Sequence, residues 1–132
     1  WNTVEHKLNT GETETNYISR MLSKINAFAK LHDIHIWIIA HPRKMEVSSD
    51  GKVSVPTLYD VSGSANWYNK IDNGLTIHRH RTDDDDYVCV YVGKIRHQYK
   101  NGKPGVVEFG YNINTGRYYE RFRTEKNLFG EG

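Results

Sequence analysis

The sequence predicts one α/β domain, and three observations indicate that class. Residues 14–31 carry the apolar stripe of an amphipathic helix. Residues 34–40 follow almost at once and are nearly all apolar, which is typical of a central strand covered by helices. From residue 75 onward the chain alternates apolar and polar residues between turn sequences, which indicates antiparallel hairpins. A helix-strand-helix front half is therefore expected before a hairpin-rich back half.

The helix over residues 14–31 is the best-defined element. Its apolar face consists of Ile18, Met21, Leu22, Ile25, Phe28 and Ala29. Thr13 or Thr15 can cap its first turn, and the acidic Glu12 and Glu14 suit the positive end of the helix dipole. The next element, residues 34–40, is expected to be a buried strand.

The middle of the chain predicts a long loop and a short helix. Residues 41–56 begin with His-Pro-Arg-Lys and show no hydrophobic period, so we expect a loop, and a loop of this length is usually functional. Residues 57–72 predict a helical segment interrupted at residues 62–64, and Asn73-Gly74 predicts a turn. The back half then predicts strands over residues 75–80, 87–96, 105–111 and 117–122, with turns at residues 82–86, 101–102 and 114–116.

Composition limits the class of protein. The chain has 132 residues, 37% hydrophobic and 26% charged, which suits one domain with a modest core. Its net charge of +2 gives no argument for nucleic acid, so that argument depends on local basic clusters. The single cysteine excludes an internal disulfide. Because no apolar run reaches about 18 residues and no signal peptide is visible, we expect a soluble intracellular protein without a membrane partner.

Lys94 and Arg96 form the most informative cluster. In a strand they project from the same face, about 7 Å apart, at the end of an apolar run. Two cations at one strand end favour an anion that arrives from elsewhere. The alternative is that they pair with the acidic residues 83–86 or with Glu108 and only hold a hairpin together.

The order of motifs resembles a known family. The predicted helix and strand are followed by His-Pro-Arg-Lys, a long loop, Ser-Gly-Ser-Ala, Gly-Lys-x-Arg, Lys-Pro-Gly-x-Val and Asn-x-Asn-Thr-Gly-Arg. This order resembles the C-terminal half of hexameric replicative helicases, the DnaB-like motors with a RecA-like P-loop NTPase fold. The likeness is nearest to Twinkle-like and phage primase-helicases and runs over residues 1–120.

The resemblance implies DNA-binding and nucleotide-sensing residues. It implies that Arg43 and Lys44 open a first loop for single-stranded DNA. A second DNA-binding loop is implied at Ser62, Gly63, Ser64 and Ala65. His41 is similar to the polar sensor that reports the γ-phosphate of the nucleotide to the DNA loops.

The resemblance also implies a site shared between subunits of a ring. Lys94 and Arg96 are similar to the pair that reaches a neighbour's ATP, with Arg96 as the arginine finger; such a finger typically raises the rate by about 10³ to 10⁵. The chain contains neither a Gly-x-x-x-x-Gly-Lys-Ser/Thr motif nor a Walker B aspartate. ATP and Mg²⁺ would therefore be held mainly by residues outside this chain, which alone should not hydrolyse ATP. It would be one partial domain, residues 1–132, whose first element lies upstream of Trp1.

Other interpretations stay open at the level of function. The chain could be a non-catalytic DNA-binding or assembly module, or part of a RecA-like ATPase that does not unwind DNA. The expected setting is the cytoplasm of a bacterial or phage-infected cell, with the mitochondrial matrix as the second choice.

Single residues also have simpler explanations. His41 could terminate a strand, and Arg43 with Lys44 could be solvated charges. Trp67 and Tyr68 could pack in the core instead of stacking on a base. Residues 83–86 could bind a metal but suit a solvated turn, and His78 with His80 lacks a third zinc ligand nearby.

Overall fold

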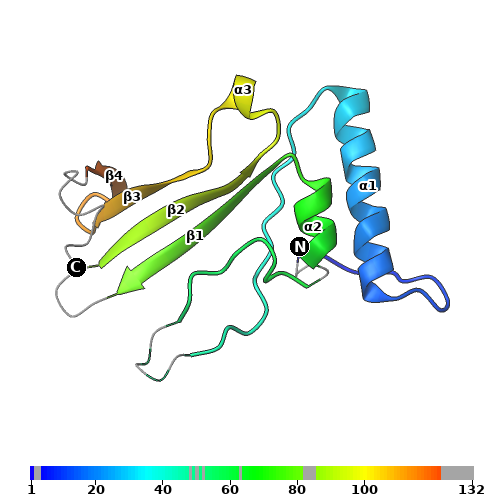
Figure 1. Ribbon diagram of the computed structural model, residues 1–132, viewed down its shortest axis with the longest axis horizontal. Helices are drawn as coiled ribbons and strands as arrows, with labels where there is room; N and C mark the ends of the chain where they lie inside the picture. Colours follow the sequence, from blue (N-terminus) through cyan, green and yellow to red (C-terminus); the bar gives the residue numbers. More distant parts are fainter. Residues whose placement is uncertain are drawn as a thin grey trace.

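The computed structural model describes residues 1, 4–47, 49, 51, 53–62, 64–81 and 86–122. It places the two longer of its three described helices beside one end of a four-stranded sheet (Figure 1). The helices are α1 (Glu14–His32), α2 (Ser64–Lys70) and the one-turn α3 (Gln98–Asn101); the strands are β1 (Asn73–Arg81), β2 (Asp86–Ile95), β3 (Gly105–Asn112) and β4 (Arg117–Arg121). Every strand in the sheet pairs antiparallel, in the order β1-β2-β3-β4. This mixed architecture is compatible with the predicted α/β class.

Helix α1 confirms the predicted amphipathic helix. Its cap is Thr13, whose hydroxyl oxygen accepts a hydrogen bond from the Asn16 amide at 3.3 Å. Its C-cap is Asp33, which takes a left-handed conformation with φ 50°. Neither α1 nor any other helix in the described part of the chain is long and apolar enough to cross a membrane.

The core lies between α1 and α2. Its buried residues are Tyr17, Ile18, Leu22 and Trp67. Trp67 is only 5% exposed, and its indole N–H donates to the Ser62 carbonyl at 2.8 Å. The expectation that Trp67 packs in the core is therefore confirmed. The apolar stripe of α1 is covered only in part, because Phe28 near its C-terminal end stays 51% exposed.

The prediction of a buried central strand at residues 34–40 is wrong. The segment is not a β-strand, and among the described residues no neighbouring strand pairs with it. Ile38 and Ala40 pack against the core, whereas Trp37 and Ile39 are 73% and 77% exposed. An apolar run becomes a central strand only where strands lie on both sides, and the sheet described here forms entirely from later residues.

The hairpins of the back half are confirmed within one or two residues. Residues 114–116 form the predicted turn, where Gly116 has φ 67°. Of the turn predicted at residues 101–102, Asn101 instead ends the short helix α3 and Gly102 caps it, and most of the turn at 82–86 lies outside the described residues. Asn73 and Gly74 begin β1 instead of forming a turn, and a register shift follows Gly74. A Cβ at Gly74 would lie 2.4 Å from a terminal methyl of Leu58, so any larger residue here would have to push the Leu58 side chain aside.

The start of α1 is held by an ion pair that makes stability depend on pH. The guanidinium of Arg20 donates to both carboxylate oxygens of Glu12 at 2.8 Å. Hydrogen bonds from Arg20 and from the Asn9 amide lower the pKa of Glu12 from 4.5 to about 2. In the unfolded chain Glu12 takes up a proton near pH 4.5, whereas in the folded chain it stays charged until about pH 2. Acidification through this range therefore favours the unfolded state.

We expect Glu12→Gln to flatten the fall in melting temperature between about pH 4.5 and 2, with little change in that slope above pH 5. Thermal unfolding of both proteins across this pH range measures the effect. The exposed Glu5→Gln is the matched control. An unchanged acid slope in the Glu12 variant would show that the ion pair does not contribute.

Candidate functional site

The predicted site residues lie at the two ends of α2. Ser62 and Ser64 lie at its N-terminal end, whereas Lys94 and Arg96 contact the residues at and just after its C-terminal end. A helix of seven residues is about 10 Å long, so the predicted DNA loop and the predicted cation pair are near one another without touching.

Arg96 is held by groups of its own chain. Its Nε lies 2.8 Å from Oδ1 of Asp72, and its Nη2 donates to the carbonyls of Asn69 and Ile71 at 3.2 and 3.4 Å. The backbone N–H of Arg96 also donates to the Asp72 carbonyl at 2.7 Å. The side chains of Arg96 and Asp72 remain 40% and 59% exposed. Asp72 therefore neutralises the charge of Arg96 locally, but the ion pair is open to solvent.

The acidic partner differs from those that the sequence suggested. Arg96 pairs neither with Glu108 nor with Asp86, which instead forms an ion pair with Arg79; residues 83–85 lie outside the described part of the chain. Nothing local in the sequence marks Asp72 as this partner. Only the register of β1 on β2, with Asn73 opposite Ile95, brings Asp72 beside Arg96.

Lys94 is more enclosed than Arg96. Its ammonium donates to the Tyr68 carbonyl and lies 4.7 Å from the centre of the Tyr68 ring. Tyr68 in turn stacks on Tyr59 with 4.7 Å between ring centres. Burial, and to a lesser extent the charge of Arg96, lowers the pKa of Lys94. These contacts anchor Lys94 and leave Arg96 as the more accessible cation.

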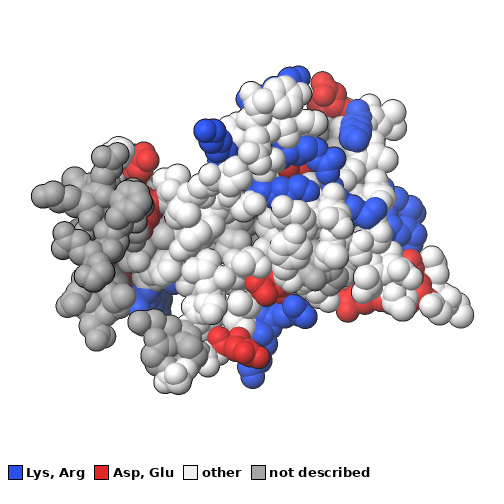
Figure 2. All heavy atoms as spheres, viewed as in Figure 1, with Lys and Arg blue, Asp and Glu red and all other residues white. Residues whose placement is uncertain are grey.

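An open groove of about 410 Å³ lies beside Arg96. It is lined from α1 by Ser23, Asn26, Ala27 and Lys30, and from the α2 side by Asn69, Lys70, Asp72 and Arg96. Lys70 donates to the Ser23 hydroxyl at 2.7 Å, and the Asn26 amide donates to the Lys70 carbonyl at 2.6 Å. The lining holds three basic side chains against one carboxylate, which favours a polyanion. Figure 2 shows Lys and Arg gathered over the half of this face that carries the helices.

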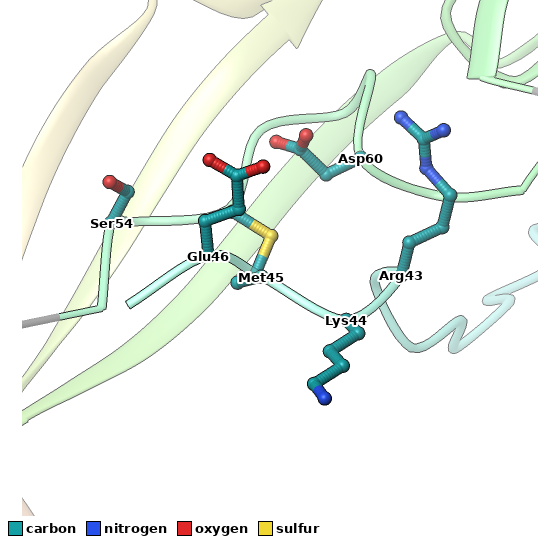
Figure 3. Close-up of a pocket in the computed structure, with 6 residues that line it drawn as sticks. All are labelled: Arg43, Lys44, Met45, Glu46, Ser54 and Asp60. Atoms are coloured by element: carbon teal, nitrogen blue, oxygen red, sulfur yellow. The ribbon is translucent and has the colours of Figure 1, made fainter. Parts of the chain in front are cut away.

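A second open groove, of about 440 Å³, lies at the predicted first DNA loop (Figure 3). It is lined by Arg43, Lys44, Met45, Glu46, Ser54 and Asp60. Hydrogen bonds from the backbone N–H and the hydroxyl of Thr57 lower the pKa of Asp60, and the charge of Arg43 adds a smaller effect. Lys44 points away from both carboxylates, which leaves its ammonium available to a phosphate (Figure 3).

The two predicted DNA loops lie side by side. The Arg43 amide donates to the Asp60 carbonyl at 2.6 Å, two residues before Ser62. The Ser62 hydroxyl donates to Glu14 at 3.1 Å, whereas Ala65 is exposed. Gly63 and the side chain of Ser64 lie outside the described residues. His41 is exposed on the extended segment, and no strand tip presents it as the sequence predicted.

The histidine pair on β1 is occupied by aromatic contacts. The rings of His78 and His80 lie 4.6 Å apart, and His80 Nε2 lies 2.9 Å from the Tyr91 hydroxyl. Burial and the neighbouring His80 lower the pKa of His78. Across the residues that the structure describes, no three His, Cys, Asp or Glu side chains come together as a metal site.

Comparison with known proteins finds a curated relative. The chain is 38% identical over 121 residues to the Twinkle homolog protein, chloroplastic/mitochondrial, of Arabidopsis thaliana. The matched region covers 89% of this chain but only 16% of that protein. No family model matches, and no solved structure matches. Over most of its length the chain is therefore similar to a short part of a Twinkle homolog, the type of protein that its motif order resembles.

Proposed function

We propose that this chain is the C-terminal part of the RecA-like motor domain of a ring-forming, ATP-dependent replicative DNA helicase of the DnaB-like, Twinkle-like type. Its similarity to a Twinkle homolog over 89% of its residues supports the family. The observation that carries the mechanism is the accessible Arg96 beside a groove lined by three basic residues and one acidic residue.

In this proposal Arg96 is the arginine finger for the nucleotide of a neighbouring subunit. Its fixed positive charge would stabilise the negative charge that develops as the γ-phosphoryl group leaves. Lys94, anchored on Tyr68, would add a second positive charge to the site that meets the neighbour's ATP. The phosphate cradle and the residues that hold Mg²⁺ would lie outside this chain, on the protomer that binds the ATP.

DNA would bind at the other end of α2. Arg43 and Lys44, together with the loop at residues 62–65, would hold single-stranded DNA by its backbone and with little sequence preference. His41, which precedes Arg43 by two residues, would report the state of the nucleotide to this loop. The expected setting is a bacterial or phage-infected cell, whereas the similar Arabidopsis protein is named as chloroplastic/mitochondrial.

ATP-dependent strand displacement by the complete protein tests this proposal. A helicase should separate a forked duplex only with ATP and Mg²⁺. A DNA-binding or assembly module would bind DNA equally with and without ATP, and neither would hydrolyse it nor separate strands. A RecA-like ATPase of another kind would hydrolyse ATP in the presence of DNA but leave the duplex intact.

Replacing Arg43 and Lys44 together with alanine should weaken single-strand binding by the complete protein and reduce its salt dependence. Two lost phosphate contacts should make the slope of log affinity against log salt shallower by about 1.4, since each contact to single strands contributes about 0.7. Fluorescence anisotropy with a labelled oligonucleotide at several salt concentrations measures the slope. Lys7→Ala with Lys24→Ala removes two exposed lysines elsewhere and should change nothing. An unchanged slope in the Arg43 and Lys44 variant would remove this loop from the DNA site.

A further inference from the structure

We propose that Asp72 is the positioning residue for Arg96, an inference that rests on the proposed arginine-finger function. Asp72 directly precedes β1, and Arg96 directly follows β2. The two residues are joined twice, by the backbone bond of 2.7 Å and by the ion pair of 2.8 Å. Asp72 therefore fixes both the backbone and the side chain of Arg96.

The contacts occupy one edge of the guanidinium. The carboxylate of Asp72 forms the ion pair with Nε, and the carbonyls of Asn69 and Ile71 accept hydrogen bonds from Nη2. Within the described residues no hydrogen bond involves Nη1. Because the guanidinium is a rigid planar fork, holding Nε and Nη2 also fixes the direction of Nη1. Arg96 is thus presented with one edge held and one edge available at the groove.

A carboxylate beside a site for a triphosphate reduces the attraction of that site for anions. Asp72 would therefore weaken nucleotide binding by its charge, whereas it would help the reaction by orienting Arg96. Fixing a long side chain before the reaction removes the entropy cost of ordering it in the transition state. The geometry points to an effect on the chemical step and not on binding.

The test compares Asp72→Ala, Asp72→Asn, Arg96→Ala and the Asp72→Ala, Arg96→Ala double variant in the complete protein. We expect Asp72→Ala to lower kcat for ATP hydrolysis by roughly 10- to 100-fold, the size of effect that misplacing a reacting group produces. The KM for ATP and the affinity for a non-hydrolysable analogue should stay within about twofold. Asp72→Asn should recover most of kcat, because an amide oxygen still accepts from Nε. The double variant should be no slower than Arg96→Ala, because the two residues act as a unit.

A pair that only holds the base of the hairpin would change the melting temperature but not kcat at a temperature where the protein stays folded. The inference is overturned if Asp72→Ala hydrolyses ATP at or above the normal rate while Arg96→Ala is inactive. Should Arg96→Ala hydrolyse ATP normally, the proposed function itself fails. If Asp72→Ala does not fold, Asp72→Glu takes its place in the test. The longer side chain of glutamate should lower kcat without changing nucleotide affinity. A normal kcat in Asp72→Glu would also overturn the inference.

Discussion

Replacing Arg96 with alanine in the complete protein should abolish ATP hydrolysis while leaving nucleotide binding largely intact. The expected loss is about 10³-fold or more in kcat, because a finger acts on charge that develops only in the transition state. Steady-state hydrolysis in the presence of single-stranded DNA measures the rate, and binding of a fluorescent nucleotide analogue measures the affinity.

Arg79 offers the matched control on the same hairpin. It also forms an exposed ion pair, with Asp86, and it lies away from the groove that Arg96 lines. Arg79→Ala removes the same kind of side chain and should hydrolyse ATP at close to the normal rate. Hydrolysis near the normal rate in Arg96→Ala would show that the finger assignment is wrong.

Replacing Trp67 with alanine should be the most destabilising change in the described core. Trp67 is 5% exposed and packs against the buried face of α1. Removing a buried tryptophan side chain leaves a cavity and costs about 3 to 5 kcal/mol of unfolding free energy. Urea unfolding of the complete protein, followed by a spectroscopic signal that reports on this domain, measures the change in unfolding free energy.

Trp67→Phe separates packing from the other possible role of this residue. Phenylalanine keeps most of the buried ring but loses the hydrogen bond to the Ser62 carbonyl, so we expect a smaller loss of about 1 to 2 kcal/mol. Both variants should retain single-strand binding where they are folded. Normal stability of Trp67→Ala combined with weaker DNA binding would instead indicate a base-stacking tryptophan.

Elements with local signals could be predicted from the sequence. Helix α1 has its apolar period and its cap within one segment, and the hairpins of the back half have alternation and turn residues close together. The segment at residues 34–40 has no such local determinant. Its apolar composition is equally compatible with a covered strand and with the partly exposed extended segment observed, because the difference depends on which strands lie beside it.

The same distinction applies to the candidate site. The alternation of side chains along a strand predicts that Lys94 and Arg96 project from one face of the sheet. Both side chains do contact the same segment, around the C-terminal end of α2. The pairing with Asp72 could not be predicted, because it depends on the register shift after Gly74. Without that irregularity, Asp72 would lie opposite Ile95 instead of Arg96.

Mixing two inactive forms of the complete protein tests the central claim most directly. One form carries Arg96→Ala and keeps its own phosphate cradle, and the other carries a disabled phosphate cradle and keeps Arg96. If Arg96 acts on a neighbour's nucleotide, mixed rings contain interfaces where an intact cradle meets an intact finger, and ATP hydrolysis should return. Mixed rings that form normally but stay inactive would contradict the account.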